Sequence, residues 1–206
     1  MSVSIPDWAP VALALAILAA RFAWALGRDA ESGQSIALRR AWVKRILASP
    51  GSEILAIQTV RNSIMAASLM SSTAVLALMG VISIGHSQLG AADTMSDWMH
   101  AGANVKLFLP LALLAACVVL FSKAVRLYHR AGYSLGLSRR GSGSDDLSDA
   151  AEAAASGELT RAAHLYRNGW RTFYAAIATG AWLVGAWMML ATTLIIVAID
   201  IAAKIE

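Results

Sequence analysis

Four long runs of apolar residues divide this sequence and limit what it can fold into. They cover about residues 8–27, 54–85, 105–127 and 172–199. A membrane-spanning helix needs about 20 consecutive apolar residues, and each run reaches that length. Of the 206 residues, 58% are hydrophobic and 15% are charged, whereas soluble domains carry about 25% charge. The sequence therefore predicts an all-α integral membrane four-helix bundle, with residues 1–206 forming one transmembrane domain.

The second run is too long for a simple crossing. At 1.5 Å per residue, residues 54–85 exceed the ~30 Å hydrocarbon core by about half. The polar stretch from Gln58 to Ser63 is expected to stay at the interface, which shortens the span. We therefore predict spans at about 8–27, 62–85, 105–127 and 172–199. The segments between them, 28–61 and 128–171, are predicted to be cytoplasmic.

The distribution of basic residues sets the predicted orientation. Twelve Lys and Arg residues fall in the two segments predicted to be cytoplasmic, and Lys123 and Arg126 at the adjoining end of the third span raise the number to fourteen. This is the pattern of the positive-inside rule. The N-terminus, the middle loop and the C-terminus hold only Lys106 and Lys204. This predicts a multi-pass protein of the cell (inner) membrane with both termini on the non-cytoplasmic side. The net charge of +4 is thus explained by topology, and no nucleic-acid partner is expected.

Short amphipathic helices are expected in the cytoplasmic segments. In the first, SIALRRAWVKRIL, Arg40, Lys44 and Arg45 share a polar side, while Arg39 intrudes on the apolar side. Such a helix is typical of one lying in the membrane interface. The Ala-rich stretch 147–168 is interrupted by Ser156-Gly157, which predicts two short helices there. The apolar side of the first helix comprises Leu38, Trp42, Val43, Ile46 and Leu47.

Small residues recur along two of the predicted spans. In lipid, where the tails are as apolar as leucine, small side chains favour helix association because they allow the backbones to approach closely. We therefore predict that these residues form helix-packing faces. They are Ala67, Ser68, Ser71 and Ser72 in the second span, and Gly180 and Gly185 in the fourth.

A girdle of polar residues is predicted at the cytoplasmic ends of three spans, and it is the candidate binding site. Gln58, Arg61 and Asn62 have helical spacing and share one side of the second helix. One interpretation is that the girdle anchors the helices and contacts anionic lipid head groups without specificity. The other is a specific pocket for an anionic head group or a loop of a partner. Its members are Gln58, Arg61, Asn62, Ser63, His129, Arg130, Tyr133 and Arg171.

No catalytic or cofactor-binding motif is present in the sequence. It lacks CxxC, HExxH and a phosphate-binding glycine loop. A bis-histidine haem in a bundle needs ligands that project inward from facing helices, and no histidine falls in the middle of a predicted span. His86 and His100 are the candidates for a peripheral metal or haem site, but we expect them to be solvated interfacial histidines. No cofactor and no catalytic residue is therefore predicted.

Three runs of the sequence resemble one known family. The run AIQTVRNSIMAASLMSSTAVL (56–76), HRAGY after the third span and NGWRTFYAAI at the fourth resemble an uncharacterised multi-pass membrane-protein family, domain-of-unknown-function family 599. The resemblance covers about residues 41–197. The resemblance implies leucine where this chain has Val60, and a second histidine beside His129 where this chain has Arg130. The absence of that second histidine weakens any paired-histidine site. The family implies no activity, but the resemblance adds Gly132 to the girdle residues that it marks.

These features favour a non-enzymatic role. We expect an integral membrane subunit, or an assembly or scaffold protein, of a larger membrane complex. The alternatives are a transporter or channel formed by self-association and a histidine-based redox carrier. The expected partners are the lipid bilayer with its anionic head groups, and other membrane subunits or further copies of the chain.

Overall fold

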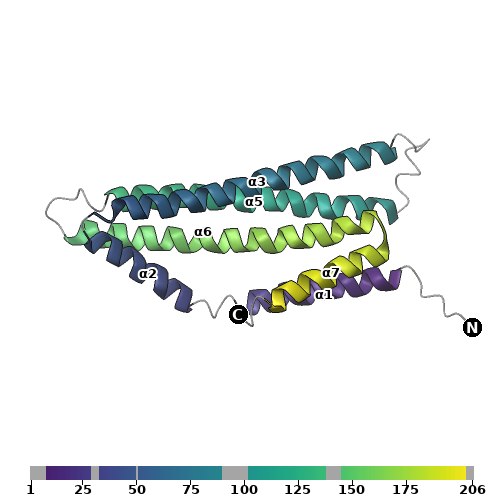
Figure 1. Cartoon of the computed structure of the whole chain (residues 1–206), viewed down its shortest axis with the longest axis horizontal. Helices are drawn as coiled ribbons and strands as arrows, with labels where there is room; N and C mark the ends of the chain where they lie inside the picture. The colour runs from purple at the N-terminus through teal and green to yellow at the C-terminus, as the bar shows by residue number, and fades with distance from the viewer. Residues whose placement is uncertain (1–7, 29–32, 50, 90–101, 138–144, 203–206) are drawn as a thin grey trace, which may run out of the picture. The chain divides into compact units, whose positions relative to one another are not determined.

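The structure, a computed structural model, describes residues 8–28, 33–49, 51–89, 102–137 and 145–202. Within these ranges it contains six α-helices, one short 3-10 helix and no strand, which confirms the all-α prediction (Figure 1). The helices are α1 (Trp8–Arg28), α2 (Gly33–Ala48), α3 (Glu53–Leu89), α5 (Gly102–Leu137), α6 (Asp145–Gly180) and α7 (Ala186–Ala202), and the 3-10 helix is η2 (Ala181–Leu183).

Two of the described helices are long and apolar enough to cross a membrane. These are α3, through its stretch Ile54–Gly85, and α5, through its stretch Val105–Gly136. Shorter apolar helices cover Trp8–Trp24 and Ala186–Ala202. At 1.5 Å per residue, each of the two long segments reaches about 48 Å, well beyond a ~30 Å hydrocarbon core.

The prediction of two short helices in the stretch 147–168 is wrong, because α6 runs unbroken through Ser156 and Gly157. The Ser156 hydroxyl donates to the Ala153 carbonyl oxygen at 3.1 Å, and the Thr160 hydroxyl donates to the Ser156 carbonyl oxygen at 2.8 Å. These bonds stay within the helix, so neither side chain draws the backbone out of it. Alanines on both sides have the highest helix propensity and outweigh one interior glycine.

The fourth apolar run, by contrast, is not one helix. The chain leaves α6 at Gly180, passes through η2 and begins α7 at Ala186. Gly180 and Gly185 flank this break, and a Cβ placed at either would meet nothing within 4 Å. The two glycines thus lie at a turn between helices. After the turn α7 runs back in the opposite direction to the end of α6 (Figure 1).

The chain divides into two compact units. The first, here called the terminal unit, comprises Met1–Gly27, Ala74–Cys117 and Trp170–Glu206. The second, here called the central unit, comprises Arg28–Thr73 and Val118–Gly169. Each of α3, α5 and α6 therefore contributes residues to both units.

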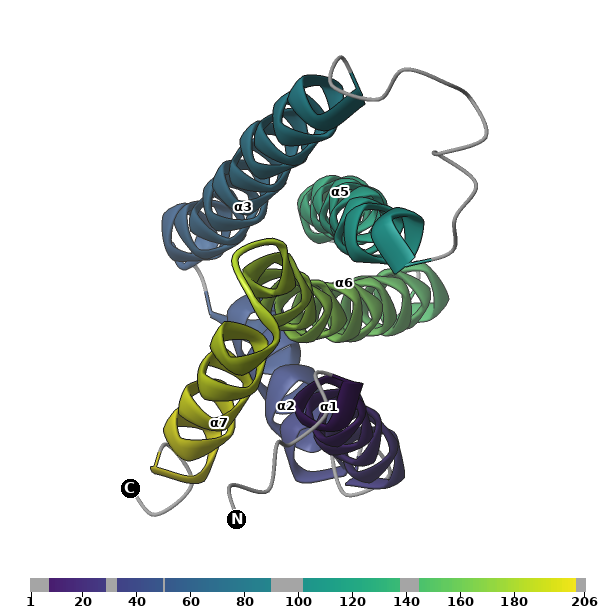
Figure 2. The same cartoon turned by 90° about the vertical axis from the view of Figure 1, so that its right-hand side faces the viewer.

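The core of the terminal unit joins α1, α7 and the end of α6. Small and aliphatic side chains make up this core, which suits closely packed helices. Near their C-terminal ends, the Arg21 guanidinium of α1 forms an ion pair with the Asp200 carboxylate of α7. Both helices run in the same direction along the long axis of Figure 1, and Figure 2 shows α1 nearly end-on and α7 obliquely. The buried core residues are Val11, Ala14, Leu18, Ala178, Met189 and Ile196.

The core of the central unit joins α2, α3, α5 and α6. The amphipathic helix predicted around residues 35–47 is present as α2, and its Val43 and Ile46 are buried in this core. A turn at Gly51, where φ is +87°, leads into α3. The Ser52 hydroxyl donates to the carbonyl oxygens of Ile46 and Ser49, both at 2.6 Å, and so holds the end of α2 against the start of α3.

Candidate functional site

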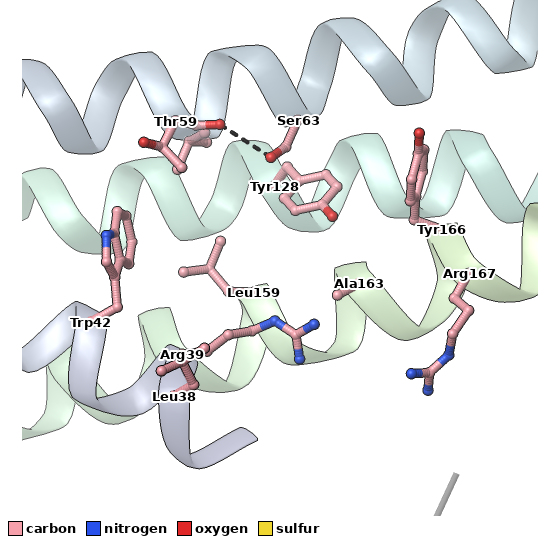
Figure 3. Close-up of a pocket in the computed structure, with 11 residues that line it drawn as sticks. Leu38, Arg39, Trp42, Thr59, Ser63, Tyr128, Leu159, Ala163, Tyr166 and Arg167 are labelled. Carbon is pink, nitrogen blue, oxygen red and sulfur yellow. Dashed lines mark hydrogen bonds between the residues drawn. The ribbon is translucent and has the colours of Figure 1, made fainter. Parts of the chain in front are cut away.

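A cavity of about 560 Å³ lies in the central unit between α2, α3, α5 and α6 (Figure 3). This volume falls within the range of about 300–1,000 Å³ typical of small-molecule sites. Aliphatic and aromatic side chains form one part of the lining, and arginine and hydroxyl groups form the other. The lining residues are Leu38, Arg39, Trp42, Thr59, Val60, Ser63, Tyr128, Leu159, Ala163, Tyr166 and Arg167.

The register of α2 brings Arg39 to the cavity. Arg39, Val43 and Ile46 are spaced i, i+4 and i+7, so they share one helix face. Because Val43 and Ile46 are buried, that face must turn toward the other three helices. Figure 3 shows the Arg39 side chain extending along the cavity, with its guanidinium pointing toward Ala163.

Two tyrosines line the cavity from α5 and α6. Tyr128 belongs to the buried core and is only 8% exposed. The Tyr166 ring meets the Phe121 ring edge-on, with the centroids 5.7 Å apart. This contact fixes the ring of Tyr166 and leaves its hydroxyl beside the cavity (Figure 3).

The remaining polar lining comes from α3 and α6. The Ser63 hydroxyl donates to the Thr59 carbonyl oxygen at 3.1 Å, and the Thr59 hydroxyl donates to the Leu55 carbonyl oxygen at 2.8 Å. Each hydroxyl oxygen keeps its acceptor capacity. On α6, the Arg167 guanidinium lies 2.8 Å from Nδ1 of His164. In Figure 3 the Arg167 side chain extends away from Tyr166, so the two arginines of the lining occupy different parts of the cavity.

The charge of the lining indicates what it can bind. Among the eleven lining residues there are two arginines and no aspartate or glutamate. A guanidinium presents a planar set of donors that matches the oxygens of phosphate or carboxylate. The aliphatic and aromatic lining suits an apolar group attached to that anion. The cavity thus has the chemistry to hold an anionic amphiphile.

The polar girdle predicted from the sequence is only partly brought to the cavity. Three girdle residues share one side of α3, and that side is exposed: Gln58, Arg61 and Asn62. None of the three lines the main cavity. Ser63 does line it. Asn62 and Ser63 also line a smaller hollow of about 380 Å³ that shares Thr59, Tyr128 and Tyr166 with the main cavity.

The girdle residues of α5 also face outward. His129, Arg130 and Tyr133 are exposed. Nε of Arg130 forms an ion pair with the Glu158 carboxylate on α6 at 3.1 Å. Ser134 donates a hydrogen bond to the same carboxylate at 3.2 Å. This group of residues joins α5 to α6 away from the cavity.

Two other girdle positions have distinct surroundings. Arg171 is half-buried and belongs to the terminal unit, whereas the other girdle residues belong to the central unit. Gly132 packs near α3, where an added Cβ would lie 3.6 Å from Val60. That separation is an ordinary van der Waals contact, so the space there does not require glycine.

Sequence reasoning missed Trp42, Tyr128, Tyr166 and Arg167 as lining residues. The one usable signal was Arg39, a cation that interrupts the apolar side of a predicted amphipathic helix. The tyrosines are dispersed in sequence and have no motif, so only the packing of α5 against α6 brings them together.

The histidines do not form a described metal site. His100 and the side chain of His86 lie outside the described residues. In the ranges that the structure describes, no three His, Cys, Asp or Glu side chains come together as potential metal ligands. Cys117, the single cysteine of the sequence, is buried within α5.

A family model described as "Protein of unknown function, DUF599" matches residues 9–203. The match covers nearly all of the chain, and the chain therefore belongs to this family. No curated protein and no solved structure gives a significant match. Family membership thus agrees with the resemblance seen in the sequence and brings no activity with it.

Proposed function

We propose that the chain, a member of this family, is a non-enzymatic integral membrane protein serving as an accessory subunit or assembly factor of a larger membrane complex. The observation that carries the proposal is how little of α3 the chain itself covers. In the most apolar 18 residues of Ile54–Gly85 on α3, only 11% of the residues are buried inside the chain. In the most apolar 18 residues of Val105–Gly136 on α5, the buried share is 22%. Long apolar helices with open faces suit lipid and partner helices.

The small residues of α3 support a partner role on one face. Ala67 is fully buried, and the Ser71 hydroxyl lies 3.5 Å from that of Ser122 on α5. Ser68 and Ser72, one turn apart, are instead exposed. The first pair therefore serves packing within the chain. The second pair leaves an open strip where another helix can approach closely in lipid.

The proposed membrane arrangement places α1, the apolar parts of α3 and α5, and the α6–α7 turn in the bilayer. Basic residues lie mainly between the end of α1 and Arg61 and between Lys123 and Arg171. By the positive-inside rule these segments are cytoplasmic and the N-terminus is outside. The cell (inner) membrane is the proposed location.

The pairing of α1 with α7 supports a different position for the C-terminus from that expected on the sequence. Arg21 and Asp200 are paired near the ends of two helices that run in the same direction. If α1 enters from outside and ends inside, then α7 also ends inside. Lys204 then joins the other cytoplasmic cations. We therefore place the N-terminus outside and the C-terminus inside.

The test is purification of the tagged chain from its native membrane in mild detergent, followed by native mass spectrometry. We expect a membrane protein at fixed stoichiometry with the wild type and with the control Leu76→Ile. Ser68→Leu should lose this partner while the chain itself remains folded, because the larger side chain blocks close approach. Ser71→Leu should instead destabilise the isolated chain. Masses corresponding only to multiples of the chain would contradict the accessory role and favour self-association.

A further inference from the structure

Arg39 stands out among the cations of α2 because it lies on the buried face of that helix and not on the exposed one. Its neighbours Arg40, Lys44 and Arg45 are all exposed. Partial burial of a guanidinium is unfavourable unless polar or anionic groups receive it. The cavity lining supplies tyrosine and serine or threonine hydroxyls but no carboxylate. The cavity is therefore electrostatically incomplete and favours an anion.

The cavity also lies at a defined level along α3 and α5. On α3, Thr59 and Ser63 precede the apolar run that begins at Ile64. On α5, Tyr128 comes directly after the apolar run that ends at Leu127. In a membrane protein these positions correspond to the membrane–water interface, where tryptophan and tyrosine are enriched. Phospholipid head groups lie at that same level.

The lining combines the two chemistries of a phospholipid. Arg39 offers bidentate donors for a phosphate, and the hydroxyl of Tyr128 can donate a further hydrogen bond. Leu38, Trp42 and Leu159 provide apolar surface on the α2 side of the cavity (Figure 3). A free inorganic phosphate would use only the polar half of this lining.

We propose that this cavity binds the phosphate head group of an anionic phospholipid, with the Arg39 guanidinium on the phosphate and the glycerol backbone against Trp42 and Leu159. The proposal rests on the membrane location proposed above, and it assigns the lipid to a site other than the exposed girdle. The bound lipid fills the space between α2 and the other three helices of the central unit.

The test measures phospholipid binding to the purified, full-length protein in detergent by native mass spectrometry. The probes are phosphatidylglycerol, phosphatidylcholine and inorganic phosphate. We expect phosphatidylglycerol to bind the wild type in preference to phosphatidylcholine. Arg39→Gln should weaken it about tenfold, the effect of losing one charge-assisted interaction. Arg39→Lys should recover only part of the loss because the ammonium is not bidentate. Arg45→Gln, an exposed cation on the same helix, is the matched control.

A second variant tests the site without changing its charge. Ala163→Leu adds bulk beside the Arg39 guanidinium and should exclude the lipid while the helices remain folded, as circular dichroism can check. Equal phosphatidylglycerol binding by the wild type, Arg39→Gln and Ala163→Leu would overturn the proposal. Binding of inorganic phosphate that depends on Arg39, without preference for phosphatidylglycerol, would also overturn it in favour of a soluble anion. Neither readout requires a partner protein, so failure here is separate from failure of the accessory role.

Discussion

Arg21 on α1 and Asp200 on α7 are joined by an ion pair, although 179 residues separate them in the sequence. The two side chains are 11% and 32% exposed, and the Arg21 guanidinium also lies 5.8 Å from the centre of the Tyr174 ring. These contacts connect α1, α6 and α7 within the terminal unit. Since removing one member leaves the other charge partly buried, the pair is a sensitive point of the fold.

Asp200→Asn is therefore expected to lower the stability of the chain by about 1–3 kcal/mol. The double variant Arg21→Met/Asp200→Leu should recover much of that loss, because it removes both charges together. Thermal unfolding in detergent measures both effects. Arg130→Gln is the control, because its ion pair with Glu158 involves a side chain that is 70% exposed and should change stability by less than about 1 kcal/mol. Equal losses from Asp200→Asn and Arg130→Gln would contradict a structural role for the buried pair.

Two glycines of α6 offer a matched test of helix packing. A Cβ at Gly169 would lie 2.7 Å from the Phe121 ring, whereas a Cβ at Gly157 would meet nothing within 4 Å. Gly169→Ala should therefore destabilise the protein by about 1–3 kcal/mol through overpacking. Gly157→Ala should be neutral or stabilise it by up to about 1 kcal/mol, through improved helix propensity. Replacing Phe121 with Leu should partly relieve the loss of stability caused by Gly169→Ala. If the two substitutions had independent effects, the contact between Gly169 and the Phe121 ring would be contradicted.

The exposed girdle and the cavity make opposite predictions for conservative changes. Arg61 and Asn62 are exposed and do not line the main cavity. Arg61→Lys keeps an exposed charge and Asn62→Ala removes an exposed neutral amide, so both should leave phosphatidylglycerol binding within about twofold of wild type. Loss of bound lipid with either variant, at unchanged folding, would return the specific site to the girdle. The measurement is lipid bound per mole of folded protein.

The helical class, the two long apolar helices α3 and α5, and α2 were predictable because each depends on local composition and periodicity. The apolar runs of α3 and α5 read directly as long helices, and the spacing of Val43 and Ile46 identified the buried side of α2. The same pattern contained the clue to the cavity, since Arg39 shares that side. The reason for a cation on that side becomes visible only in the structure, where α3, α5 and α6 form a cavity with α2 and Arg39 lines it.

The errors came from features whose meaning depends on packing. Ser156-Gly157 resembled a helix break, but surrounding alanines and hydrogen bonds internal to α6 keep the helix continuous. Gly180 and Gly185 flank the turn that reverses the chain into α7, and their role in packing against other helices stays a prediction. Helical spacing correctly placed Gln58, Arg61 and Asn62 on one side of α3. It could not show that this side is exposed.

The position of the C-terminus relative to the membrane separates the arrangement proposed here from a four-span bundle with both ends outside. Single cysteines at Ser2, Ser142 and Ala203 in a Cys117→Ser background can be labelled on intact cells with an impermeant thiol reagent. We expect labelling at position 2 alone, with positions 142 and 203 reacting only after permeabilisation. Labelling at both 2 and 203 would contradict the parallel pairing of α1 and α7 in the membrane. Labelling at 142 on intact cells would overturn the orientation itself, and with it the cytoplasmic location of the cavity.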